Sequence, residues 1–130
     1  MLQWTDNLRV EDDSTNLQHQ QLIALCNRFS RLAESTSKDA RREYHELLND
    51  LAGLLYKHFD GEEALLERNR SPHLAAHRQE HLRFQEQLAT LLCDSLGDKL
   101  DFAALQQLLE GYIGQHVVKW DLPDKTYLRQ

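Results

Sequence analysis

Residues 71–92 read SPHLAAHRQEHLRFQEQLATLL and carry the plainest helical pattern in the chain. Ser71 can cap a first helical turn, and Pro72 suits the first helical position. Beyond them, key side chains recur at intervals of three and four residues, the spacing of one face of a helix. These positions are Leu74, His77, His81, Phe84 and Leu88. The stretch therefore predicts an amphipathic helix whose inward face carries two histidines among apolar residues.

Three further segments repeat this periodicity, and with the first they predict an all-α fold. They cover approximately residues 14–35, 39–68 and 100–119, and the quoted helix continues to about residue 97. The linkers between segments are short, which forces consecutive helices to lie antiparallel. We expect an up-down-up-down antiparallel four-helix bundle formed by one domain, 1–130. An extended N-terminal arm should precede it, anchored to the bundle by Trp4.

Composition and charge exclude several classes of protein. Hydrophobic residues make up 41% of the 130 residues and charged residues 28%, as in ordinary soluble domains. A net charge of -6 without a stripe of lysine and arginine argues against nucleic-acid binding. No apolar run approaches the roughly 20 residues of a membrane span, and the polar N-terminus does not resemble a secretory signal. We therefore expect a cytoplasmic protein with no nucleic-acid partner and no membrane insertion.

Seven side chains of metal-binding type lie on the four predicted helices. They are His19 on the first, His58 and Glu62 of HFDGE on the second, His77 and His81 on the third, and His116 and Asp121 of HVVKWD on the fourth. Residues four apart share a helix face. Burying imidazoles and carboxylates in a leucine-rich core is costly unless they are paired or bind metal. Four inward groups, one per helix, therefore predict a single metal centre in the core.

Asp121 is the least regular member of this set. It follows His116 by five residues, which is out of register on an α-helix. Pro123 indicates that the helix is ending there. We expect a loosened last turn to swing the carboxylate inward.

The donor set predicts which metal binds and how many ions there are. Five imidazoles and two carboxylates exceed the four ligands of a zinc site. Nitrogen and oxygen donors in a bundle core suit iron or manganese, and seven ligands suit two ions that share bridging carboxylates.

Four other reactive side chains are expected to take no part in the site. Cys26 and Cys93 fit no metal-binding or redox spacing, and we expect both to be buried free thiols. His45 should be a solvated surface residue. His73 should lie on the surface at the start of the third helix.

These motifs resemble the hemerythrin family, specifically the single-domain bacteriohemerythrins, over nearly the whole chain. The resemblance rests on Trp4, the Gln18-His19 pair, HFDGEE (58–63), Pro72 ahead of HRQEH (77–81), and HVVKWD (116–121). It implies a non-haem di-iron site, with one iron held by His77, His81 and His116 and the other by His19 and His58. Glu62 and Asp121 would bridge the two irons together with an oxo or hydroxo group. Dioxygen would bind at the open position of the iron that has two histidines.

The resemblance implies reversible dioxygen binding for carriage, storage or sensing rather than enzymatic activity. Against an enzyme, we find no acid or base on the inward faces besides the ligands. Two alternatives stay open: a di-iron enzyme or protein that handles NO or peroxide, and an isolated regulatory module that senses oxygen or iron. A separate protein partner for delivery or signalling also stays open.

Three positions depart from the family pattern. Asn16 stands where Asp is frequent, Leu66 where Met is common, and Tyr112 where Trp is common. None of them is a ligand, so we expect them to bear on oxygen affinity and autoxidation rate.

Overall fold

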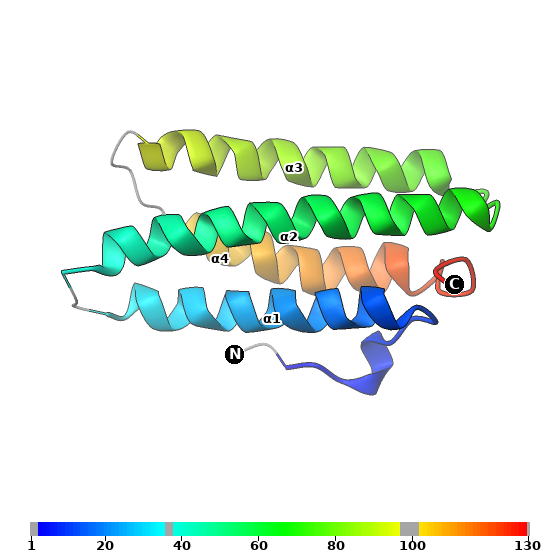
Figure 1. Ribbon diagram of the computed structural model, residues 1–130, viewed down its shortest axis with the longest axis horizontal. Helices are drawn as coiled ribbons and strands as arrows, with labels where there is room; N and C mark the ends of the chain where they lie inside the picture. Colours follow the sequence, from blue (N-terminus) through cyan, green and yellow to red (C-terminus); the bar gives the residue numbers. More distant parts are fainter. Residues whose placement is uncertain (1–2, 36–37, 97–101, 130) are drawn as a thin grey trace.

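A computed structural model describes residues 3–35, 38–96 and 102–129. Part of the first predicted linker (36–37) and residues 97–101, including the predicted start of the fourth helix at Leu100, lie outside the described residues. The described chain forms four helical rods (Figure 1). They are α1 (Asp13–Ala33), α2 (Ala40–Arg68), α3 (Leu74–Leu96) and α4 (Phe102–Gly111), the last continued by the π-helix η2 (Tyr112–Asp121).

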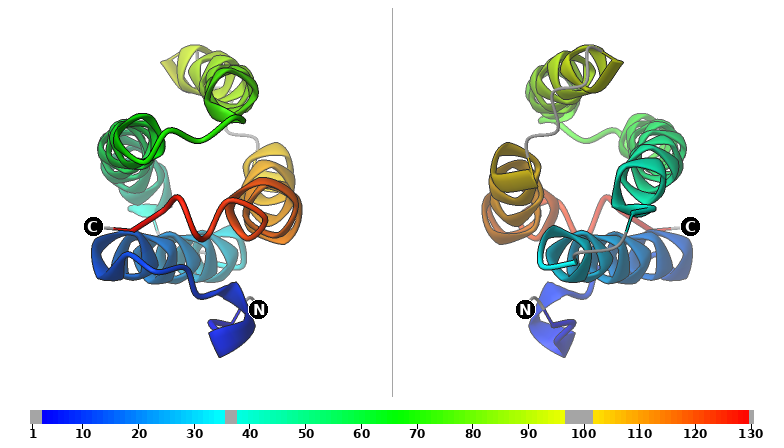
Figure 2. Two further views of the ribbon diagram at one scale, coloured as in Figure 1. Left: turned by 90° about the vertical axis from the view of Figure 1, so that its right-hand side faces the viewer. Right: turned by 90° about the vertical axis from the view of Figure 1, so that its left-hand side faces the viewer.

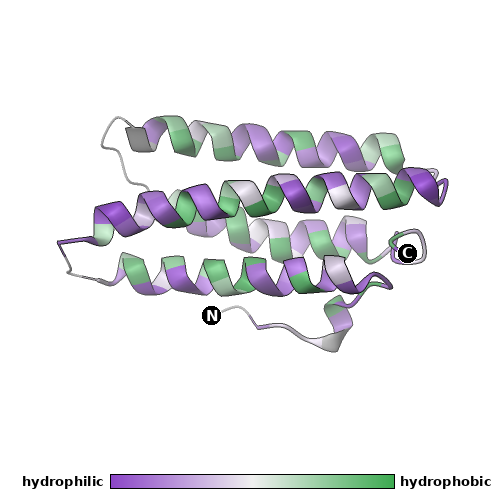
Figure 3. Cartoon of the chain, in the orientation of Figure 1, coloured by the Kyte–Doolittle hydropathy of each residue, from purple (hydrophilic) through white to green (hydrophobic). Residues whose placement is uncertain are grey.

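The rods form an antiparallel bundle. Seen end-on, they occupy the corners of a square, and each packs against two neighbours (Figure 2). Apolar and polar residues alternate along each rod at helical spacing (Figure 3). The inward face of α2 is closely packed, with Leu47, Leu48, Leu51, Leu55 and Phe59 all buried. The predicted all-α four-helix bundle is confirmed.

Side-chain hydrogen bonds hold the backbone near the starts of two helices. The Asp12 side chain accepts from the Thr15 backbone N–H at 2.8 Å and so caps α1. The Ser71 hydroxyl accepts from the His73 backbone N–H at 3.1 Å, which agrees with the predicted cap. Residues 72–73 nevertheless form a turn, so α3 begins at Leu74, two residues after the predicted first helical position, Pro72.

The N-terminal arm runs along the outside of α1 (Figure 1). It is extended except for the 3-10 turn η1 (Asp6–Leu8), and Trp4 packs against the core as predicted. The Asn16 side chain fixes the arm, because it accepts from the Val10 N–H and donates to the Val10 carbonyl, both at 2.8 Å. A carboxylate at position 16 could only accept, so this departure from the family pattern serves the arm.

The C-terminal tail crosses one end of the bundle (Figure 2). The Asn69 side chain, at the end of α2, donates to the carbonyls of Tyr127 and Arg129 at 2.8 and 2.9 Å. Leu128 is buried with Leu66 in a small apolar cluster. The tail therefore closes the end of the bundle at which α2 ends and α3 begins.

The two cysteines differ in their surroundings. Cys26 is buried as predicted, and burial raises the pKa of its thiol to about 11. The prediction for Cys93 is wrong, because this side chain is exposed. It lies five residues after the inward-facing Leu88, a spacing that turns it off the buried face of an α-helix. Among the described helices, none is long and apolar enough to span a bilayer.

Candidate metal centre

The structure brings the seven predicted residues together in the core. His116 is the most accessible of them, and its exposed fraction is 7%. The residues form two groups, and the ligand atoms of each group lie within 4.8 Å of one another. One group contains His77, His81 and His116, the other contains His19 and His58, and Glu62 and Asp121 belong to both. All four rods contribute.

Asp121 reaches the centre because of the π-helix. In η2 the backbone N–H groups bond five residues back, as Leu122 does to the Val117 carbonyl at 2.8 Å. The wider turn places residues five apart on one face, and Asp121 Oδ1 lies 3.2 Å from His116 Nε2. The expected explanation, a loosened last turn, is wrong. A π-helical segment provides the register instead. Such segments are rare in general and frequent at functional sites.

Each carboxylate lies between histidines of the two groups. Asp121 Oδ1 lies 2.8 Å from His77 Nε2, and its Oδ2 lies 3.2 Å from His19 Nε2. Glu62 Oε1 lies 3.0 Å from His58 Nε2 and 3.4 Å from His81 Nε2. Both side chains are therefore placed to contact two ions at once.

Several of these atoms are buried without a hydrogen-bond partner in the described part of the chain. They are both Glu62 oxygens, Asp121 Oδ2, and the Nε2 atoms of His81 and His116. Neighbouring ligand atoms lie at ion-pair distances from some of them without forming hydrogen bonds. Unsatisfied polar atoms that converge in a core are costly, and a bound cation satisfies lone pairs of this kind. The residues therefore fit a metal centre.

The second ring nitrogens of three histidines are held by neighbouring side chains. Gln18 lies 2.8 Å from His58 Nδ1, and Glu63 lies 2.9 Å from His81 Nδ1. Asp124 lies 3.1 Å from His77 Nδ1. An acceptor at Nδ1 orients the ring and leaves Nε2 free to bind a cation.

The sequence carries a signal for two of these three orienting side chains. Gln18 and Glu63 are direct neighbours of His19 and Glu62, so the QH and EE pairs carried a signal. Asp124 lies in the tail after Pro123, where no helical periodicity predicts that it is buried.

The charges of the centre stabilise one another strongly. Burial lowers the pKa of His77, but the hydrogen bond and charge of Asp121 outweigh it and raise the pKa to about 9. Burial and Asp121 raise the pKa of Glu62, but contacts with His58 and His81 outweigh them and lower it to about 2. Without metal, the raised pKa values of His19 and His77 favour protons on these two rings, which offset the charge of the two carboxylates. Cations would have to replace those protons.

The two remaining histidines lie outside both groups. His73 is exposed as predicted, with 57% of its side chain accessible, but its Nδ1 also lies 2.8 Å from Asp124 Oδ1. The prediction for His45 is wrong in part, because this residue is half-buried with its ring edge against Tyr44.

Comparison with known families agrees with this geometry. The sequence profile of the Hemerythrin HHE cation binding domain matches residues 12–122. The chain belongs to the hemerythrin family. The match covers all seven residues of the centre and confirms both the resemblance and a metal-binding role. Among curated proteins, no sequence matches this hemerythrin chain.

Two departures from the hemerythrin pattern have different consequences here. Leu66 packs in the small cluster with Leu128, away from the main core. Tyr112 borders the centre, since its hydroxyl lies 2.8 Å from His58 Nε2 and its ring stacks on His116 with centroids 4.8 Å apart. Burial, with the charges of Glu62 and Asp121, raises the pKa of Tyr112 well above its ordinary value. The phenol therefore stays neutral and can donate a hydrogen bond.

Proposed function

We propose that this protein binds dioxygen reversibly at a pair of iron ions, for carriage, storage or sensing. The observation that carries the proposal is the uneven division of five histidines, three against two, around two shared carboxylates. One ion would have three imidazoles and two carboxylates as ligands. The other would have two imidazoles and the same two carboxylates, and therefore fewer protein ligands. The ion with fewer would keep a position free for an external ligand.

In this proposal His77, His81 and His116 hold one iron, and His19 and His58 hold the other. Glu62 and Asp121, which belong to both groups, would be shared by the two ions and would offset part of their charge. Two irons held there would supply the electrons for reversible dioxygen binding.

Aromatic side chains pack on the inner side of the histidines and reduce their contact with water. Phe59 stacks on His81 with centroids 4.1 Å apart, and Phe84 lies against Tyr112 at 4.8 Å. Dry, apolar surroundings limit the supply of protons to a bound ligand. This favours release of dioxygen over irreversible oxidation.

Optical titration with dioxygen tests the function. Iron-loaded protein that has been reduced without air should change colour on exposure to dioxygen. The original colour should return when the gas is removed, and metal analysis should find two irons per chain. A colourless protein with one zinc would contradict the proposal. Irreversible oxidation with substrate turnover would instead favour a di-iron enzyme. The cytoplasmic location and a protein partner stay predictions from the sequence.

A further inference from the structure

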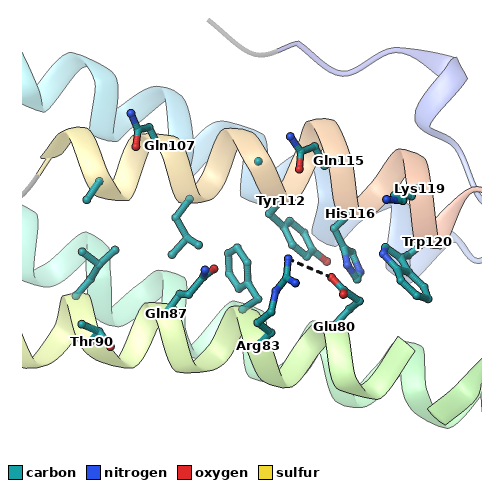
Figure 4. Close-up of a pocket in the computed structure, with 15 residues that line it drawn as sticks. Glu80, Arg83, Gln87, Thr90, Gln107, Tyr112, Gln115, His116, Lys119 and Trp120 are labelled. Carbon is teal, nitrogen blue, oxygen red and sulfur yellow. Dashed lines mark ion pairs between the residues drawn. The ribbon is translucent and has the colours of Figure 1, made fainter. Parts of the chain in front are cut away.

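A groove of about 650 Å³ runs between α3 and the rod formed by α4 and η2 (Figure 4). Its volume suits a small molecule. Phe84, Tyr112 and His116 belong to its lining, and polar side chains such as Gln87 and Gln115 stand around them. Because His116 is a proposed iron ligand, the groove reaches the metal centre from the surface.

Tyr112 stands between this groove and the inner side of the centre. Its ring lines the groove and stacks on His116, and its hydroxyl lies 2.8 Å from His58 Nε2. His58 belongs to the group with two histidines, on which the free position is proposed. A ligand that moves from the groove toward His58 therefore passes close to this ring.

The charges of the groove differ in sign from those of the whole chain. Arg83 and Lys119 line it with one carboxylate, Glu80, in a chain whose net charge is -6. The nearest Arg83–Glu80 distance is 3.9 Å, and 72% of the Arg83 side chain is exposed, so this pair neutralises little. In Figure 4 the Arg83 side chain points from α3 toward Tyr112. The groove is thus a locally positive site on an acidic protein.

We propose that this groove is the entrance through which small inorganic anions reach the metal centre, and that Tyr112 controls passage. The inference rests on the proposed iron centre. When His58 Nε2 binds a cation it can no longer accept a hydrogen bond, so the Tyr112 hydroxyl is free to donate to the arriving anion. Tyr112 thereby acts on both the passage and the retention of the ligand.

Azide binding to the oxidised, iron-loaded protein tests the entrance by stopped-flow absorbance. Gly111 lines the groove, and a Cβ there meets nothing within 4 Å, so Gly111→Leu adds a side chain to the groove wall at a position where the first added atom is unhindered. The matched control is Gly53→Leu, at an exposed glycine of α2 where a Cβ is equally unhindered. In Gly111→Leu the azide association rate constant should fall about five-fold or more, and in the control it should stay unchanged.

Two further variants separate charge from hydrogen bonding. Lys119→Gln should lower the association rate constant at low salt, and the effect should fade as salt screens the charge. Tyr112→Phe keeps the ring and removes the donor, so azide should dissociate about ten-fold faster.

A reporter that does not depend on iron is available in Trp120, which lines the groove. With Trp4→Phe as background, Trp120 is the remaining one of two tryptophans. Iodide should quench its fluorescence less in Gly111→Leu and Lys119→Gln than in Gly53→Leu. Equal azide association rate constants in iron-loaded Gly111→Leu and Gly53→Leu would overturn this inference and leave the proposed iron centre standing. A parent protein that loads no iron would overturn the proposed centre, and the inference with it.

Discussion

At the scale of single residues, the side chains behind the histidines decide how firmly a cation is held. Asp124 is buried between His73 and His77 and accepts from both rings. The negative charge of Asp124 makes the opposite nitrogen of His77 a better donor to metal. The tail residue is thus part of the centre although it contacts no cation.

Replacing that charge should weaken metal binding. Asp124→Asn keeps the shape of the side chain and should lower metal affinity about 10- to 100-fold, measured by competition with a chelator. Asp60→Asn, at an exposed position of α2, is the control and should have no effect. Equal affinities in the two variants would remove Asp124 from the centre.

The pKa of His77 predicts how the metal-free protein responds to pH. The pKa is raised from 6.5 to about 9 in the folded state, so the folded protein binds its proton more tightly than the unfolded chain. The resulting stabilisation is complete below pH 6.5 and is lost as pH rises through 9. The free energy of unfolding, measured with urea, should fall over this range.

Two comparisons check that assignment. His77→Gln should flatten the dependence of stability on pH between 6.5 and 9. The stability of the metal-loaded protein should also not depend on the proton of His77, because an imidazole that binds metal is neutral. A metal-free protein that becomes more stable over this range would contradict the assignment.

At the scale of elements, the sequence predicted the four rods because leucines and histidines recur at three- and four-residue intervals. Six of the seven residues of the centre followed from this period. Asp121 needed a different argument, because a π-helix has another period and the sequence carries no signal that distinguishes it from an α-helix. The prediction for Cys93 was wrong for a related reason. Its apolar neighbours in the sequence suggested burial, whereas its angular position on α3 exposes the side chain.

The inward face of α2 should carry much of the stability of the bundle. Leu51 is fully buried, and Leu51→Ala should lower the free energy of unfolding by about 2–5 kcal/mol. Leu17→Ala makes the same change on α1 at a side chain that is 55% exposed, and it should cost far less. Chemical unfolding of both variants measures the difference, and similar losses would place the core elsewhere.

At the scale of the whole molecule, the bundle surrounds the centre from four sides and the tail closes one end. Antiparallel rods bring residues from positions 19 to 121 into one small volume, which the order of motifs allowed the sequence to predict. The tail contacts and the groove between α3 and α4 could not be predicted, because both depend on how rods and loops pack after they form. Helical periodicity says nothing about such spaces.

Anomalous diffraction at the iron edge from crystals of the iron-loaded protein tests the central claim most directly. The account predicts two iron peaks in the core, one beside His77, His81 and His116 and the other beside His19 and His58. Glu62 and Asp121 should contact both. A single peak, or two peaks without a shared carboxylate, would contradict it.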